Sequence, residues 1–301
     1  MHYIGHIAAL ATSVAWSCTS VLFTISGRKI GSIISNQMRL IFATLLATLT
    51  HFIIFQSFVP MNAGSTRWMW LALSGIFGYI VSDGFLFQSF IYIGPRLSML
   101  MFSVSPIFSA MMAWLFFHEA LSLQEVIAIL IVVSGVGFVV FDQQSQTDAP
   151  DTTSGGNLRK GLLLGLIAAV GQSVGLIFSK LGLQGDYPAL SGNVIRLLSA
   201  AVLIWLPVLL GGKTPEIIKT MRGNISAFWS VAGGAFSGPF LGVWLSLIAI
   251  QNAPMGIAST LMGLAPVMLL PISWIFFKER FGWKAILGTV IAVIGTALFF
   301  L

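Results

Sequence analysis

The chain has 301 residues, of which 57% are hydrophobic and 8% charged, and its mean hydropathy is +0.95. Soluble proteins carry about 25% charged residues, so this composition excludes a soluble globular protein and predicts an integral membrane protein. The net charge of +6 does not indicate a nucleic-acid partner, because the 15 Lys and Arg are scattered singly near the ends of apolar stretches. The single cysteine, Cys18, lies inside such a stretch, which leaves no disulfide framework and no thiolate metal cluster.

Apolar stretches of about 20 residues, the length of a bilayer-crossing helix, follow one another along the chain. Short connections with Gly, Pro, Asn or charged residues separate them. The first stretch has no basic start and no cleavage site, so we interpret it as a span rather than a signal peptide. We therefore expect an all-α integral membrane protein with ten transmembrane helices. The predicted spans are 5–25, 34–55, 68–91, 97–117, 123–141, 161–179, 190–210, 228–250, 256–277 and 283–301.

An internal repeat organises these spans. The segment SPIFSAMMAWLFFHE, which begins at Ser105, recurs 160 residues later as APVMLLPISWIFFKE. The same separation relates Gly135 to Gly295 and Gly78 to Gly238. We expect a first five-span repeat over residues 3–141 and a second over 161–301. Between them, residues 142–160 are polar and without apolar periodicity, which predicts a flexible linker.

Five spans in each half is an odd number, so the second half must enter the membrane from the opposite side and form an inverted repeat. Inverted halves can exchange conformations, which predicts a site at their interface that opens first to one side and then to the other. We therefore expect a secondary active transporter. Duplication is also compatible with a passive channel or facilitator, or with a membrane scaffold, and a lipid-handling or enzymatic membrane protein is a third alternative.

Polar residues inside the predicted spans indicate where the site lies, because they are costly in hydrocarbon unless they face protein or water. Asp83 is the clearest case and lies four residues after Tyr79, on the same predicted helix face. It is either a proton carrier or amine partner, or a carboxyl that bonds a neighbouring hydroxyl or backbone group. The second repeat has Val243 at the matching position, so the repeat does not require the charge.

Spans one and six supply a second, related set. Trp16 and Ser17 correspond there to Gln172 and Ser173, and such residues offer a stacking wall and hydrogen bonds to a small polar metabolite. Filling of the core and bonding to neighbouring helices are the alternative roles. The predicted substrate-binding residues, in a cavity between the halves near the middle of the membrane, are Trp16, Ser17, Tyr79, Asp83, Gln172 and Trp244.

Two further features have a structural interpretation. Arg39 and Arg196 recur near the starts of spans two and seven, with Asn three residues before each, and we interpret both as interfacial anchors rather than anion-binding groups. Pro239 lies in the middle of span eight and predicts a kink. Glu119, at the end of span four, is expected to cap a helix or form a salt bridge.

The sequence carries no enzymatic constellation. Its four histidines are dispersed, and no HExxH, GxSxG or phosphate-binding loop occurs. We therefore expect a protein that is not an enzyme, with no cofactor and no metal.

The duplicated unit resembles the EamA-type permeases of the drug/metabolite transporter superfamily. The resemblance rests on the ends AWLFFHEALS and SWIFFKERFG of spans four and nine, on the Arg near the start of each second span, and on the glycine-bearing ends SGVGFVVF and IGTALFF. It implies a ten-span permease of the inner (plasma) membrane that exports amino acids or other metabolites. Membrane lipid and a small-molecule substrate are the expected partners, and coupling to protons is a further expectation.

Two signals for the orientation of the chain in the membrane disagree. The resemblance implies cytoplasmic termini, yet only Arg67, Lys180 and Arg196 fall on the side of the termini and the other twelve basic residues fall opposite. The positive-inside rule would then place the termini outside.

Overall fold

The computed structural model describes residues 3–142, 155–277 and 282–298, and every regular element in these ranges is helical. Six of the helices are long and apolar enough to cross a membrane: Ile4–Gly27, Ile33–Phe55, Ser65–Leu86, Leu158–Gly182, Ala189–Leu210 and Ile225–Asn252. Four described apolar helices are shorter: Ser105–Phe117, Leu123–Phe138, Met255–Pro271 and Ile286–Ala297. Each of the ten predicted spans overlaps one of these segments.

The helices of the first repeat are α1 (Ile4–Ile30), α2 (Ser32–Phe55), the short η1 (Met61–Ala63), α3 (Ser65–Gly75), the π-helical η2 (Ile76–Ser82), α4 (Asp83–Phe102), α5 (Ser105–Phe117) and α6 (Leu123–Asp142). Those of the second repeat are α7 (Gly155–Gly182), α8 (Ala189–Leu210), α9 (Thr214–Arg222), α10 (Ile225–Ala235), the π-helical η4 (Phe236–Gly242), α11 (Val243–Asn252), α12 (Met255–Met262), α13 (Ala265–Phe277) and α14 (Trp283–Ala297). The repeat predicted from sequence is therefore visible in the elements themselves. Helices α3 and α10, η2 and η4, and α5 and α13 begin and end 160 residues apart.

Several predicted boundaries are wrong. The connection predicted at residues 93–96 lies inside α4, which continues to Phe102, and the break falls instead at residues 103–104. The predicted span 256–277 is divided between α12 and α13 at Gly263 and Leu264. The connection after α8 contains a helix, α9, and the last six residues of the predicted linker belong to α7. The rest of the linker, residues 143–154, lies outside the described residues.

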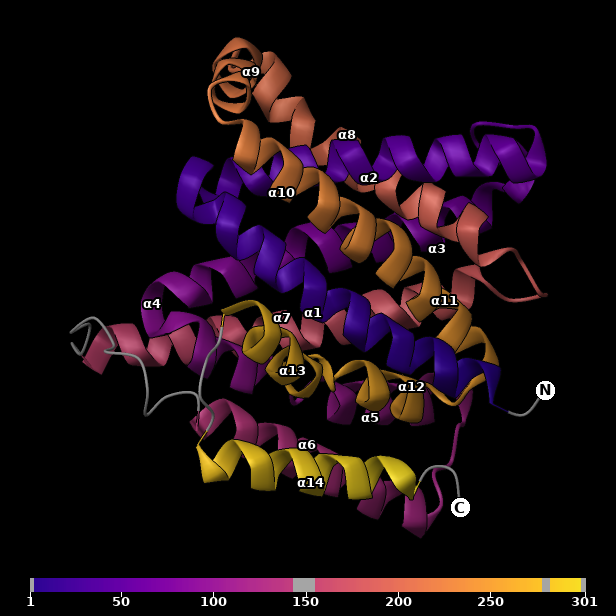
Figure 1. Ribbon diagram of the computed structural model, residues 1–301. Coiled ribbons are helices and arrows are strands. Elements are labelled where there is room, and N and C mark those ends of the chain that lie inside the picture. Colours follow the sequence, from indigo (N-terminus) through magenta and orange to yellow (C-terminus); the bar gives the residue numbers. More distant parts are fainter. Residues whose placement is uncertain (1–2, 143–154, 278–281, 299–301) are drawn as a thin grey trace.

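The first helix of each repeat packs against the other repeat. Helix α1 contacts α10, η4, α11, α12 and α13, whereas α7 contacts α3, η2, α4 and α5. Figure 1 shows α1 running between α10 and α11 on one side and α12 and α13 on the other. The two halves therefore exchange their first helices, and α6 and α14, the last helices, lie side by side at one edge (Figure 1).

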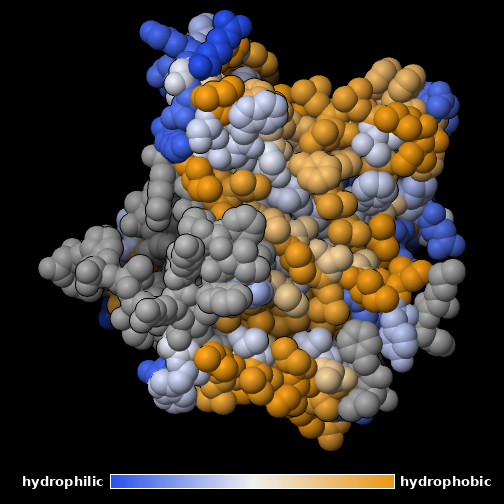
Figure 2. Space-filling model, viewed as in Figure 1, coloured by the Kyte–Doolittle hydropathy of each residue, from blue (hydrophilic) through white to orange (hydrophobic). Residues whose placement is uncertain are grey.

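Apolar side chains cover the outside of the bundle. Leu210, Leu123 and Ile53 are 81%, 77% and 72% exposed, values that suit contact with lipid rather than water. Figure 2 shows hydrophobic residues over the middle of the molecule and hydrophilic ones over α9 and at the far ends of the helices. This distribution is that of a multi-pass membrane protein.

Candidate functional site

A cluster of polar side chains lies inside the bundle, where α2, α3, η2, the start of α4, α7 and α8 meet. We call it the polar cluster. Its members are Asn36, Arg39, Ser74, Tyr79, Asp83, Ser179, Asn193 and Arg196. Two of the six predicted site residues, Tyr79 and Asp83, belong to it.

Both arginines of the cluster are buried, which corrects their interpretation as interfacial anchors. Arg39 is 7% exposed and Arg196 is 5% exposed. Each lies seven residues beyond the first residue of its helix, α2 or α8, which corresponds to a depth of about 10 Å. A guanidinium buried among other helices is not on the protein surface, where an interfacial anchor would lie. The repeated Asn-x-x-Arg pattern indicated that the two arginines have related roles. The sequence did not show that both lie on the inner face of their helices.

Arg39 forms an ion pair with Asp83. Its Nη2 donates to Asp83 Oδ2, and its Nε donates to Asn36 Oδ1 at 2.6 Å. The guanidinium also lies over the Phe23 ring of α1, 5.5 Å from the ring centroid. The ion pair therefore joins α2 to the first residue of α4.

Arg196 has a different set of partners. Its Nη1 donates to the hydroxyls of Ser74 and Ser179, and its guanidinium lies 5.5 Å from the centroid of the Tyr79 ring. Ser74 Oγ also donates to Gly175 O, which joins α3 to α7. The second arginine is therefore surrounded by hydroxyl groups and an aromatic ring.

The two π-helices meet at the cluster. The Tyr79 hydroxyl of η2 lies 3.4 Å from Pro239 O of η4 and 3.3 Å from Asn193 Oδ1, and Asn193 Nδ2 donates to the carbonyls of Pro239 and Phe240 at 3.1 Å each. Tyr79 and Pro239 are equivalent positions of the two repeats. The two π-helices are therefore in contact at equivalent positions of the repeats.

Pro239 does not by itself produce the irregular helix in which it lies. The predicted kink is a π-helical turn, and the same turn forms at η2, where Tyr79 takes the matching position. In such a turn the backbone bonds run to the fifth residue, as from the Asp83 N–H to Gly78 O. The repeated feature is therefore a wider turn in both repeats, and π-helical turns are frequent at functional sites.

In both halves, a serine of the exchanged first helix donates a hydrogen bond to a backbone carbonyl of the other repeat, and the two carbonyls are at equivalent positions. Ser17 Oγ of α1 donates to Ala265 O at 2.7 Å, and Ser173 Oγ of α7 donates to Ser105 O at 2.9 Å. Both serines are fully or almost fully buried. Ser17, a predicted substrate-binding residue, is thus engaged in a contact between helices.

The remaining predicted site residues, Trp16, Gln172 and Trp244, lie in different places. A Cβ atom on Gly242 of η4 would lie 2.8 Å from Trp16 Cδ1, so Trp16 packs directly on the second π-helix. Gln172 is partly exposed on α7, next to Gly171, which faces the backbone of Ser82 in η2. Trp16 and Gly171, the neighbour of Gln172, therefore approach equivalent positions of the two π-helices from opposite halves.

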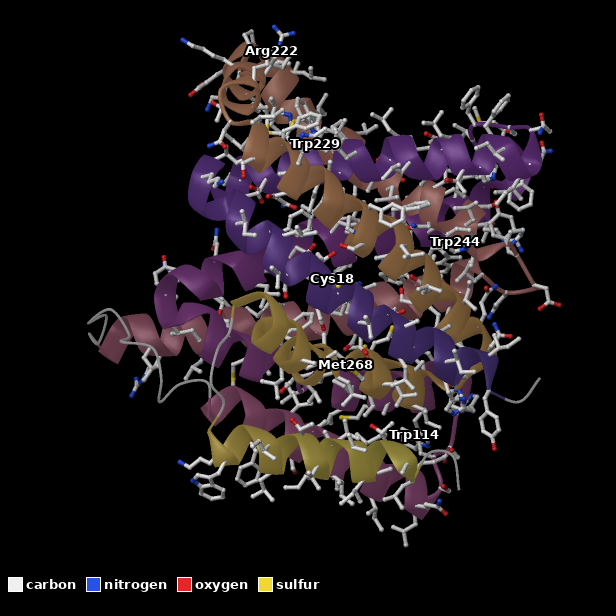
Figure 3. All side chains as sticks on the ribbon, in the orientation of Figure 1. Cys18, Trp114, Arg222, Trp229, Trp244 and Met268 are labelled. Carbon is white, nitrogen blue, oxygen red and sulfur yellow. The ribbon has the colours of Figure 1, made fainter. Side chains whose placement is uncertain are left out.

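Trp244 lines a different space. With Tyr187, Gln251 and other residues of α2, α8 and α11 it borders a pocket of about 310 Å³ near the start of α8. Figure 3 shows Trp244 toward the end of the bundle, away from Cys18, which lies midway along α1. Burial raises the pKa of the Tyr187 hydroxyl, so this group is a neutral hydrogen-bonding group at physiological pH.

Glu119 performs the predicted capping role and joins the repeats. Its Oε1 accepts from Lys180 Nζ of α7, and its Oε2 accepts from the backbone N–H of Met255, the first residue of α12, at 2.8 Å. A carboxylate at a helix N-terminus is stabilised by the free N–H groups there. The equivalent Glu279 lies outside the described residues.

These features define a multi-pass membrane protein made of two repeated units that exchange their first helices around a buried polar cluster. The model of the EamA-like transporter family matches residues 3–141 and again residues 159–301, so the chain belongs to this family. No curated protein matches the chain. A solved structure described only as "Crystal structure of protein" is similar over 99% of this chain and 97% of its own, with a TM-score of 0.76. Its 14% sequence identity makes this a likeness of fold alone.

Proposed function

We propose that the protein is a secondary active transporter of the inner (plasma) membrane that exports a small organic metabolite, such as an amino acid or a drug-like compound, by alternating access. In this proposal ten spans form two inverted five-helix repeats. The observation that carries it is the reciprocal exchange of α1 and α7, because each half then contacts the other through equivalent surfaces. Equivalent surfaces let the halves trade conformations, so that a central site opens to one side and then to the other.

The polar cluster is the proposed centre of this movement. Trp16, Ser17, Tyr79, Asp83, Gln172 and Trp244 are the proposed lining of the substrate path. Tyr79 and Asp83 are next to the contact between the π-helices, and Trp16 packs on η4. A rearrangement that opens this contact would carry these residues into the path.

Asp83 is the proposed site of proton coupling. Arg39 pairs with this carboxyl group in this conformation, and Tyr79 and Arg196 belong to the same polar cluster. Separation of Arg39 from Asp83 would leave the carboxyl group without its ion-pair partner and expose it to the path. The substitution Asp83→Asn keeps the shape but cannot titrate, so we expect a folded protein whose flux no longer changes with pH.

Counterflow in proteoliposomes tests the proposal. Vesicles are preloaded with each of a panel of unlabelled amino acids and drug-like cations, and uptake of the labelled compound is followed. A carrier gives saturable uptake that the internal compound accelerates, whereas a channel gives flux without acceleration. Flux that does not saturate would refute the carrier, and an unchanged pH profile in Asp83→Asn would remove the coupling role alone.

A further inference from the structure

The polar cluster contains more positive than negative charge. Within residues 3–142, 155–277 and 282–298, the ion pairs are Arg39 with Asp83 and Lys180 with Glu119. Arg196 therefore has no carboxylate within ion-pair distance in the described chain. Arg39, Asp83 and Arg196 together carry a net charge of +1 inside the bundle.

The partners of Arg196 do not neutralise its charge. Ser74 and Ser179 are neutral acceptors for Nη1, and Nε is buried with no hydrogen-bond partner. A buried ion costs several kcal/mol unless a counter-charge and hydrogen bonds compensate for it. The arrangement is therefore incomplete on the Nε side of the guanidinium.

The first repeat shows what is missing. Arg39, the equivalent of Arg196, donates from Nε to Asn36 and from Nη2 to Asp83. In the second repeat the equivalent of Asn36 is Asn193, whose amide is turned to the carbonyls of Pro239 and Phe240. The carboxylate is absent as well, because Val243 stands where the first repeat has Asp83.

A glycine lies directly against the same guanidinium. A Cβ atom on Gly78 would lie 3.2 Å from Arg196 Nη2, which is a tight contact. Nε has no partner, and Nη2 faces a residue without a side chain. These two nitrogens belong to an edge of the guanidinium that a carboxylate can engage with two parallel hydrogen bonds.

We propose that Arg196 binds the carboxylate of the transported compound, so that the substrate is an organic anion or a zwitterion with a free carboxylate. This inference rests on the transport function proposed above and names its substrate class. A monocarboxylate brings the net charge of the cluster to zero and supplies the acceptor that Nε lacks. Arg196 is 5% exposed in this conformation, so the carboxylate reaches it when α3, α7 and α8 separate.

Thermal unfolding of the purified protein, followed by tryptophan fluorescence, tests this without transport. The probes are L-phenylalanine, benzoate and succinate, each compared with its amide, and sodium chloride at equal ionic strength. We expect at least one carboxylate, and not its amide, to raise the melting temperature. Loss of a charge-assisted pair weakens binding about tenfold to a hundredfold, so Arg196→Gln should require that much more of the compound.

Two variants make the result specific. Arg222 is exposed at the end of α9, so Arg222→Gln is the matched control and should bind as the wild type does. If Arg196→Gln does not fold, Gly78→Ala keeps the arginine but narrows the space beside Nη2, and it should weaken carboxylate binding while the protein stays folded.

The proposal is overturned if no probe raises the melting temperature, if each amide acts like its acid, or if the response is independent of Arg196 and Gly78. A response to chloride equal to that of the carboxylates would assign the site to inorganic anions and would also overturn it. Counterflow distinguishes a failure of the carboxylate site from a failure of the proposed transport function. Binding that depends on Arg196 without saturable flux would refute transport alone, whereas saturable flux indifferent to the carboxylate would refute the anion site alone.

Discussion

Replacement of Gly135 by alanine tests how the last helices of the two repeats are joined. A Cβ atom on Gly135 of α6 would lie 2.5 Å from Ala292 N and 2.7 Å from Gly288 O of α14. Both are backbone atoms, so no side chain can turn away. Relief of the overlap requires the helices to move apart by roughly 1 Å, and a gap of that size forfeits up to about half of the attraction between facing atoms.

We expect Gly135→Ala to lower the free energy of unfolding by about 1–3 kcal/mol, as overpacking of a close contact does. For a chain of this size that corresponds to a fall of about 2–10 °C in the melting temperature. The assay is thermal unfolding in detergent, followed by tryptophan fluorescence. The control is Gly84→Ala in α4, where the added methyl would meet nothing within 4 Å. The control should melt at the wild-type temperature or above it, because alanine favours a helix over glycine by about 0.5–1 kcal/mol. Equal melting temperatures for the two variants would show that α6 and α14 are not held at backbone contact.

Three other substitutions address the contacts between the halves. Lys180→Met removes the partner of Glu119 and should lower stability by about 1 kcal/mol, measured by the same melting assay; an unchanged melting temperature would make the pair dispensable. Tyr79→Phe should cost less than about 1 kcal/mol, because the hydroxyl is 3.3 Å from Asn193 and 3.4 Å from Pro239, at the long limit of hydrogen bonding. A larger loss on melting would contradict this. Pro239→Ala should leave the melting temperature within about 2 °C, since the turn also forms without proline at η2, and should slow counterflow if the turn bends during transport.

The sequence identified the repeat because its signal is long and periodic. Fifteen-residue segments such as the one that begins at Ser105 keep their aromatic and acidic positions 160 residues later, and the helices obey the same offset. Connections with several turn-forming residues were also located correctly, as at residues 184–188, which contain Gly185, Asp186 and Pro188 and lie between α7 and α8. The connection predicted at residues 93–96 was wrong because its one glycine and one proline, Gly94 and Pro95, do not end α4.

The site was less accessible from the sequence. The pattern at Asp83 indicated a buried charge, but its partner Arg39 lies on another helix, 44 residues away. Hydropathy does not distinguish an arginine at the membrane surface from one that faces the protein interior. The two cases differ in where the helix begins, here about 10 Å before the arginine, and in which helix face the side chain occupies. The π-helices were not predicted either, since Gly78 and Gly238 are the one residue type that the two turns share at equivalent positions and glycine alone does not indicate a π-helix.

The exchange of first helices also constrains the order in which the chain can assemble. Helix α1 ends at Ile30, yet the helices that enclose it lie between Ile225 and Phe277. At about 5–20 residues per second, the ribosome needs roughly 10–40 s to reach Ile225 after α1 has been made. During this interval Thr12, Ser17 and Thr19 lack the partners that they later find in the second repeat, and lipid or the insertion machinery must shield them. If the chain were cut between the repeats, the first helix of each fragment would lack the helices on which it packs, because these belong to the other fragment. The fragments should therefore accumulate only when both are made in the same cell.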